Sequence, residues 1–421
     1  VAAFVEHTKR AISVGQDEIV ILRSNSVVVI GFDGSPVTSE EFTVDWDASA
    51  ASKGGWPSFM AKEIADQPTA VADTLMGRLD SDGKVTIPEM DGLSAADINN
   101  IDRIIIVACG TASYAGDIAK YGIEKWSRIP VQVELSHEFR YRDPIVTKNT
   151  LIVAISQSGE TMDTLMATRY ARDLGAKVLA ICNTQGATLA RESDATIYTH
   201  AGPEVAVAST KALVAQITAG FLLGLYLAEV RGATSSSELQ KLGRELLKLP
   251  AQVSEVIEGL DEAKALGTAM AKAKSVLFLG RNVGFPVAME GALKLKELAY
   301  IHAEGFAAGE LKHGPIALIE EGQPVIVIVP SPRDADSLQP KVISNIQEIR
   351  ARGARVIAIA EEGDPNVADY AEHVIFVPQS DPMFAAILTV IPLQAFALAL
   401  STAKGLDVDQ PRNLAKSVTV E

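Results

Sequence analysis

An internal repeat restricts the possible folds of this 421-residue chain more than any other feature. Residues 175–182 read Gly-Ala-Lys-Val-Leu-Ala-Ile-Cys, and residues 353–360 read Gly-Ala-Arg-Val-Ile-Ala-Ile-Ala. Further pairs of apolar runs recur at separations of about 170 to 178 residues: 151–155 with 325–329, and 104–110 with 275–280. A nearly constant separation indicates that a whole domain is duplicated.

The repeated units alternate apolar, β-branched runs with helical patterns, which predicts an α/β fold. Because the strands are almost continuously apolar, each unit should contain a parallel sheet with helices on both faces. Alternating runs at 18–22 and 26–30 instead predict antiparallel strands near the amino end. The predicted organisation is residues 1–58 antiparallel strands, 59–100 linker helix and connection, 101–232 first α/β domain, 233–271 helical connection, 272–404 second α/β domain, and 405–421 C-terminal tail.

Charge and hydropathy exclude two classes of partner. The net charge is −15, and no cluster of basic residues stands out, so nucleic acid is not expected as a partner. Residues 212–230 and 384–403 approach the length of a membrane span. Gln216 and Pro392 interrupt them and no basic cluster flanks either, so we predict buried helices and no membrane partner.

Cys109 and Cys182, the two cysteines of the chain, each close an apolar run. Buried free thiols in a reducing cytoplasm are the expected reading. No secretory signal pattern is recognised at the start of the sequence. The histidines show no metal-ligand spacing, so no metal is predicted.

The loop at 156–161, Ser-Gln-Ser-Gly-Glu-Thr, lies between the apolar run 151–155 and a helical pattern at 163–174. A helix N-terminus presents free N–H groups, and Ser156, Ser158 and Thr161 add hydroxyl donors without adding charge. Such a loop suits a phosphate monoester. An ordinary serine-rich turn without a binding role could have the same six-residue sequence.

Several further motifs carry a resemblance. They are Cys109-Gly-Thr111, Val207-Ala-Ser-Thr-Lys211, Glu290-Gly-Ala-Leu-Lys-Leu-Lys-Glu297, Gly309-Glu-Leu-Lys-His-Gly-Pro315, and the stretch 409–421, Asp-Gln-Pro-Arg-Asn-Leu-Ala-Lys-Ser-Val-Thr-Val-Glu. With the duplicated unit they resemble a pair of sugar isomerase (SIS) domains. More narrowly, residues 59–421 are similar to the synthase part of the glutamine–fructose-6-phosphate aminotransferase (isomerizing) family.

This resemblance implies an enzyme that makes glucosamine 6-phosphate from fructose 6-phosphate and ammonia, the first step of UDP-N-acetylglucosamine biosynthesis, without a cofactor. Without ammonia it would isomerise fructose 6-phosphate to glucose 6-phosphate. In the family, ammonia comes from a glutaminase whose nucleophile is an amino-terminal cysteine. Here no cysteine precedes Cys109, and residues 1–58 resemble only the last strands of that domain. Glutaminase activity is therefore expected to be absent from this chain.

The resemblance also implies a set of substrate-binding residues. Neighbouring strand ends converge in a parallel sheet, so Thr111 should join the loop at 156–161 around the phosphate. One departure is Ala112, where the family often has serine, which leaves only a backbone N–H. Ser209 alone could equally be a helix N-cap. The predicted binding residues are Thr111, Ala112, Ser156, Gln157, Ser158, Thr161, Val207, Ser209 and Ala415.

Aldose–ketose isomerisation needs a base to move a proton between C1 and C2. Glu290, Lys294 and Glu297 are spaced i, i+4 and i+7, so they share one face of a helix. Alone, that spacing also describes a solvated ladder of ion pairs, but the neighbouring leucines disfavour a purely exposed helix. By resemblance, Glu297 is the proton shuttle, and Lys294 and Glu290 shape the pocket.

Two further catalytic residues follow from the resemblance. His313 would assist opening of the sugar ring and enter the pocket from the other subunit of a homodimer. Lys416 would engage the substrate carbonyl carbon, consistent with Schiff-base chemistry. A charged tail is otherwise usually disordered, so this role requires the tail to be an ordered lid.

Two alternatives remain at this stage. One is a stand-alone phosphosugar isomerase or deglycase on the same fold, which the stretch 409–421 disfavours. The other is a regulator that senses sugar phosphates. Regulators of that kind couple one such domain to a DNA-binding helix-turn-helix, whereas this chain has two domains and a strand-like front.

Overall fold

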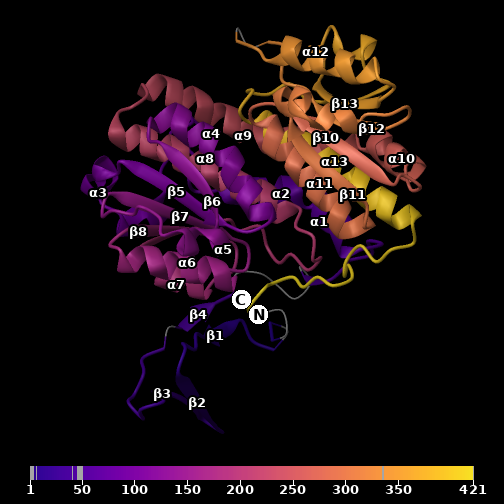
Figure 1. Ribbon diagram of the computed structural model, residues 1–421. Helices are drawn as coiled ribbons and strands as arrows, with labels where there is room; N and C mark the ends of the chain where they lie inside the picture. Colours follow the sequence, from indigo (N-terminus) through magenta and orange to yellow (C-terminus); the bar gives the residue numbers. More distant parts are fainter. Residues whose placement is uncertain (1–3, 6, 40, 45–50, 334–335, 421) are drawn as a thin grey trace.

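A computed structural model describes residues 4–5, 7–39, 41–44, 51–333 and 336–420 (Figure 1). Within it, two α/β units each contain a five-stranded parallel sheet, and the two sheets have the same strand order. The first sheet runs β6 (Val131–Leu135), β5 (Arg103–Ala108), β7 (Thr150–Ser156), β8 (Lys177–Cys182), β9 (Ala195–Tyr198). The second runs β11 (His302–Ala307), β10 (Ser275–Gly280), β12 (Pro324–Ile328), β13 (Arg355–Glu361), β14 (His373–Val377). The predicted tandem α/β fold is confirmed.

Both faces of each sheet are covered, as the apolar strands predicted. Successive residues of β5 alternate between two buried clusters: Ile104 and Ile106 face one, whereas Ile105 and Val107 face the other. The first cluster also contains Val276 and other residues of the second sheet, so the inner faces of the two units share one continuous core. A site placed between the units is therefore held by the same core on both sides.

Four helices fill this shared layer: α4 (Thr111–Ser127), α8 (Lys211–Arg231), α11 (Gly284–Ala299) and α13 (Ala385–Ala403). Both α8 and α13 have the length and hydropathy of a membrane span, but 83% and 78% of their most apolar windows are buried inside the protein. Helices that are apolar on every side are expected where packing surrounds them. The prediction of two buried helices is confirmed.

The remaining helices cover the outer faces and connect the units. They are α1 (Phe59–Ala65), α2 (Gln67–Leu75), η2 (Pro88–Gly92), α3 (Ala95–Asn100), α5 (Ser136–Phe139), η3 (Arg140–Arg142), α6 (Met162–Asp173), α7 (Thr188–Glu192), α9 (Ser236–Glu258), α10 (Asp261–Ala269), η4 (Ala308–His313), η5 (Pro315–Leu318), α12 (Gln339–Arg350) and η6 (Val367–Asp369). The linker after residue 58 differs from the single helix its sequence suggests. It breaks at Asp66, since Pro68 lies in the first turn of α2 and cannot donate a backbone N–H.

The amino-terminal part forms two small antiparallel pairs, also as predicted. Strand β1 (Arg10–Ile12) pairs with β4 (Glu41–Thr43), and β2 (Glu18–Arg23) pairs with β3 (Ser26–Gly31). Both pairs lie outside the two α/β units. Strands β1 and β4 lie beside the C-terminus, and β2 and β3 project farther away (Figure 1). The tail, yellow in Figure 1, leaves α13 in the second unit and returns along the first.

Candidate active site

The hydroxyl-rich loop joins the end of β7 to the start of α6. The Ser156 hydroxyl accepts the Gly159 N–H at 3.0 Å and lies 3.1 Å from the Thr161 hydroxyl. Ser158 Oγ accepts the Glu160 N–H at 3.2 Å. Thr161 is the residue before the first turn of α6, so its hydroxyl lies at the positive end of the helix dipole. The loop thus gathers three hydroxyls at one helix N-terminus.

Gly159 gives this loop its close packing. Its φ is +66°, and a Cβ there would lie 2.5 Å from Ala187 Cβ and 2.8 Å from Cys182 Sγ. Any side chain at this position would push the loop away from β8 and the following turn. The glycine therefore fixes where the flanking hydroxyls can lie.

Thr111 links this loop to the second unit. It is the first residue of α4, directly after β5, and β5 pairs with β7 in the sheet. Its hydroxyl accepts from Lys294 Nζ at 3.1 Å and lies 3.3 Å from Glu290 Oε1, both on α11 of the other unit. Ala112 follows as a half-buried residue that packs against the shared core.

The three charged residues of α11 form a compact cluster. Lys294 Nζ lies 3.3 Å from Glu290 Oε1 and 2.5 Å from Glu297 Oε2. The side chains of Glu290 and Lys294 are fully buried, while Glu297 is 22% exposed. A solvated ladder of ion pairs is excluded by this burial. Glu297 is the one member with an oxygen open to a ligand.

Burial alters the ionisation of this cluster. Desolvation raises the pKa of Glu290 to about 7, against the opposing charge of Lys294. Burial also opposes the charge on Lys294, but the carboxylates of Glu290 and Glu297 outweigh it and hold its pKa above the ordinary value. Lys294 therefore stays cationic, and it orients Glu297 through a charged hydrogen bond.

The C-terminal tail is ordered along the first unit. Asp409 caps α1 through its carboxylate, which accepts the N–H groups of Phe59 and Met60 at 3.0 Å each. Its carbonyl accepts the Val207 N–H at 2.9 Å. Arg412 stacks 4.2 Å from the centre of the Tyr300 ring, and its N–H donates to the Tyr300 hydroxyl at 2.8 Å. These anchors bring the following residues to the site.

Lys416 is held between a carboxylate and a carbonyl. Its Nζ donates to Glu204 Oε2 at 2.5 Å and to the Ala206 carbonyl at 2.8 Å. The next residue, Ser417, donates to Ser158 Oγ at 2.9 Å, and the Val418 carbonyl accepts the Met162 N–H at 3.1 Å. The tail thus touches the hydroxyl-rich loop and the N-terminus of α6.

The N-terminus of α8 is capped by a different residue from the one that the sequence suggested. Ser209 does not cap it. Instead Glu204 Oε1 accepts the N–H groups of Thr210 and Ala212 at 2.9 and 3.0 Å, and the Ser209 hydroxyl lies 3.4 Å from the same oxygen. A carboxylate six residues before the N-cap Thr210 satisfies N–H groups at the start of the helix. Glu204 and its neighbour Glu63 were missed as site residues, because neither lies in a recognisable motif.

A cavity of about 1050 Å³ opens beside the tail lysine. Gln157, Glu204 and Lys416 line it from the site, and Phe42 and Val44 line it from the amino-terminal strands. The site is therefore open toward the segment that precedes the first α/β unit.

Comparisons with known proteins agree with this geometry. Residues 97–225 and 269–404 match the SIS domain family. The chain is 65% identical over its whole length to a glutamine–fructose-6-phosphate aminotransferase (isomerizing) of Leifsonia xyli, covering 68% of that protein, and 61% identical to the protein of that name from Corynebacterium glutamicum, covering 67%. The chain belongs to the glutamine–fructose-6-phosphate aminotransferase family.

Solved structures agree with this family assignment. The C-terminal domain of the glucosamine-fructose-6-phosphate aminotransferase of Francisella tularensis superposes with a TM-score of 0.80 at 37% identity, covering 86% of this chain and all of that one. The tagatose-6-phosphate ketose/aldose isomerase of Escherichia coli superposes with a TM-score of 0.67 at 19% identity, covering 85% of this chain and 97% of that one, and shows the shared fold alone. About a third of each curated relative lies outside the matched part.

In this member of the aminotransferase family, two predicted residues stand apart from the cluster. His313 ends η4 and is exposed, and within the described part of the chain its ring has no hydrogen-bond or ion-pair partner. Ala415 is exposed beside Lys416. Among the described residues, no three His, Cys, Asp or Glu side chains are grouped to hold a metal ion.

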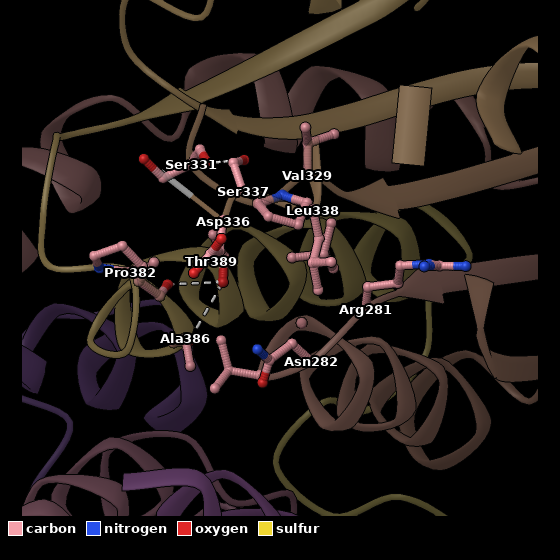
Figure 2. A pocket seen from close by; sticks show the side chains of 15 residues that line it. Arg281, Asn282, Val329, Ser331, Asp336, Ser337, Leu338, Pro382, Ala386 and Thr389 are labelled. Atoms are coloured by element: carbon pink, nitrogen blue, oxygen red, sulfur yellow. Dashed lines mark hydrogen bonds between the residues drawn. The ribbon is translucent and has the colours of Figure 1, made fainter. Parts of the chain in front are cut away.

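The second unit contains a hollow at the position that matches the hydroxyl-rich loop. It measures about 80 Å³ and lies where the chain leaves β10, β12 and β14 (Figure 2). Its lining is mainly apolar, and Arg281 extends away from Ser331 and Ser337 (Figure 2). The run of three hydroxyls within six residues is lost here: Ser331 accepts the Arg333 N–H, and Ser337, six residues later, donates to the Ser331 carbonyl.

Proposed function

We propose that this chain binds fructose 6-phosphate and converts it, with ammonia, into glucosamine 6-phosphate. One observation carries the proposal: the Lys294–Glu297 pair of one unit meets Thr111 of the other, while the tail joins Ser417 to Ser158 of the hydroxyl-rich loop and Lys416 to Glu204. A phosphate grip, a carboxylate base and an amine are the groups that this reaction needs.

The phosphate of the sugar is proposed to bind at the loop 156–161. Hydroxyls of Ser156, Ser158 and Thr161 donate to its oxygens, together with the N–H groups at the start of α6. Thr111 and the Ala112 N–H complete the site from α4, and the Gln157 side chain borders it. Backbone groups around Val207, Ser209 and Ala415 contact the sugar.

Glu297 is proposed to move the proton that interconverts ketose and aldose. Its carboxylate removes a proton from C1, and the C1–H electron pair forms the C1–C2 double bond while the C2=O π pair moves to the C2 oxygen, which takes up a proton. The same carboxyl then returns the proton to C2, and the C1 hydroxyl loses its proton as the C1 carbonyl forms. Lys294 keeps Glu297 oriented, and Glu290 holds Lys294 from the buried side.

Lys416 is proposed to attack the C2 carbonyl of the open-chain sugar. Nitrogen and C2 form a bond, water leaves, and ammonia then takes the place of the lysine amine. His313 assists ring opening, and we propose that it does so from the second subunit of a homodimer, which agrees with its exposed and unpartnered ring here.

Ammonia is proposed to reach the site from a glutaminase that this chain does not supply. The cavity that opens toward Phe42 and Val44 supports delivery from that side. We propose a cytoplasmic location, supported by free thiols at Cys109 and Cys182.

The test is an incubation of the 421-residue chain with fructose 6-phosphate, with and without ammonium chloride. We expect glucosamine 6-phosphate only with ammonium, and glucose 6-phosphate in its absence. Binding of the sugar phosphate without either product would reject the enzyme and favour a sensor. Glucose 6-phosphate alone under both conditions would favour a simple isomerase.

A further inference from the structure

Glu204 is a buried carboxylate whose oxygens are fully used. Oε1 accepts two backbone N–H groups at the start of α8, and Oε2 accepts Lys416 Nζ at 2.5 Å. Burial alone would raise the pKa of Glu204, but the Lys416 charge and these hydrogen bonds hold it below its ordinary value. Glu204 is therefore the ionised partner of the tail lysine.

Glu63, on α1, is a second buried carboxyl beside the same turn. It is 1% exposed, and its Oε1 accepts the N–H groups of Val205 and Ala206 at 2.6 and 3.2 Å. Oε2 is buried with no hydrogen-bond partner among the described residues. Desolvation and the charge of Glu204 raise the pKa of Glu63 to about 8, so it is largely protonated at neutral pH. The unpartnered Oε2 is the oxygen available to carry that proton.

Only one lysine is in contact with these two carboxyls among the described residues. Lys416 donates to Glu204, whereas Lys211 of α8 and Lys62 of α1 contact Asp66 instead, at 3.3 and 3.6 Å. Glu63 has no ion-pair partner in the described part of the chain, and its buried Oε2 has no hydrogen-bond donor. A buried carboxyl without a compensating charge favours its neutral form.

We propose that Glu63 and Glu204 form a carboxyl pair that holds one proton and fixes Lys416 as an ammonium ion beside the sugar site until substrate arrives. Both are positioning residues, and this assignment rests on the proposed role of Lys416. The pair also joins α1, which follows the amino-terminal strands, to the residue that engages the substrate.

The same pair supplies the proton acceptor that the amine needs. Lys416 must lose a proton before its nitrogen can attack C2. The N–H bond breaks and an O–H bond forms at Glu204 Oε2, which leaves a neutral amine and two neutral carboxyls. An ionised Glu63 would repel the Glu204 carboxylate more strongly than it attracts the Lys416 ammonium, so this proton transfer would become easier as Glu63 loses its proton.

Isomerisation rates from pH 6 to 10 test this assignment. The wild-type rate should rise above about pH 8, and Glu63→Gln, which mimics the protonated carboxyl, should lack that rise and be at least fivefold slower than the wild type at pH 9.5. Glu204→Gln should lower kcat about 100-fold at all pH values with KM within threefold. Glu204→Asp, which keeps the acceptor, should recover part of that loss. A purely structural role predicts similar losses for both glutamine variants, and this result would overturn the proposal.

Asp66→Asn is the matched control, because it removes a carboxylate of the same turn that pairs with Lys211 instead. Its pH profile should equal that of the wild type, and a profile like that of Glu63→Gln would overturn the assignment.

Infrared difference spectra of the substrate-free chain between pH 6 and 9.5 provide a reading independent of activity. The wild type should lose a carboxyl C=O band that Glu63→Gln lacks. If that band is absent, the assignment of a protonated Glu63 is rejected, even where the enzyme is active. If the band is present but no sugar is converted, the proposed enzymatic function is rejected instead.

Discussion

The two α/β units share a strand order but differ in the loops that follow equivalent strands. After β7 the first unit has three hydroxyls and a glycine, packed at the N-terminus of α6. After β12 the second unit reads Val-Pro-Ser-Pro-Arg and leaves a hollow of only about 80 Å³. Duplication preserved the scaffold, and the hydroxyl-rich loop is present in only one of the two described units.

The helices that follow the first strand of each unit show the reverse difference. Counted from their first residues, α11 places Glu290, Lys294 and Glu297 where α4 places Asp117, Tyr121 and Glu124. Only α11 has a buried lysine between its carboxylates. The first unit therefore retained the binding groups and the second the charged groups, and their shared core brings the two sets together. Function follows the loops and helix faces rather than the fold.

Removal of the tail lysine should have the largest effect, because Lys416 belongs to neither unit. Lys416→Ala should reduce isomerisation and amination by roughly three orders of magnitude or more, since the other amine of the site, Lys294, is buried and paired with Glu290 and Glu297. Binding of fructose 6-phosphate by calorimetry should change less than about fivefold. Lys404→Ala, in the exposed turn after α13, is the control. A normal isomerase rate in Lys416→Ala would remove this lysine from the mechanism.

Substitution of the two equivalent glutamates, one at a time, should show which unit transfers the proton. Glu297→Gln should lower kcat by about 10²- to 10³-fold, because the amide keeps the shape but cannot take a proton. Glu124→Gln, at the matching position of α4, should leave kcat unchanged, since Glu124 only accepts the Val131 N–H. Steady-state kinetics of both variants measure this. Equal losses would mean that the two helices share the proton transfer.

Loss of a loop hydroxyl should have a moderate effect confined to the first unit. Ser158→Ala should raise KM for fructose 6-phosphate about tenfold with a small change in kcat, as expected for one hydrogen bond to a charged group. Ser331→Ala, in the equivalent loop of the second unit, should leave KM within twofold. A rise in KM for Ser331→Ala would reveal a second phosphate site.

The smallest effect concerns stability. Desolvation raises the pKa of Asp117 from 3.8 to about 6, so the native state binds its proton more tightly than the unfolded chain. Its contribution to stability therefore falls as pH rises from about 4 to about 6. Asp117→Asn should gain about 1 kcal/mol at pH 7, after allowance for partial exposure, which raises Tm by about 1–2 °C, with no gain near pH 3.5. Thermal unfolding at both pH values checks this, and an equal gain at both would point to packing instead.

The sequence predicted the parts of the site that depend on local pattern. The repeat predicted both parallel sheets, and the spacing of Glu290, Lys294 and Glu297 predicted that they share a helix face. Their burial could not be read from that spacing, because a solvated ladder has the same period. It depends on how α11 packs against α4 and the shared core.

The two carboxyls near the tail lysine could not be predicted from sequence patterns. Glu63 meets Val205 across 142 residues, and Lys416 meets Glu204 across 212. Neither glutamate lies in a periodic motif, and Ser209 offered a simpler cap for α8. Pairings at such separations are set by the arrangement of the two units, which no local rule encodes.

The anchoring of α1 by Asp409 has a consequence for synthesis. The Phe59 N–H meets the Asp409 carboxylate across 350 residues, and Lys416 lies still later in the chain. At about 5 to 20 residues per second, a ribosome needs on the order of twenty seconds to a minute or more to travel that distance. During that interval the first unit can fold with Ser58 as the one described cap of α1 and with Glu204 without its lysine. The nascent chain would therefore form its hydroxyl-rich loop early and gain the Lys416 contacts only after the tail has emerged.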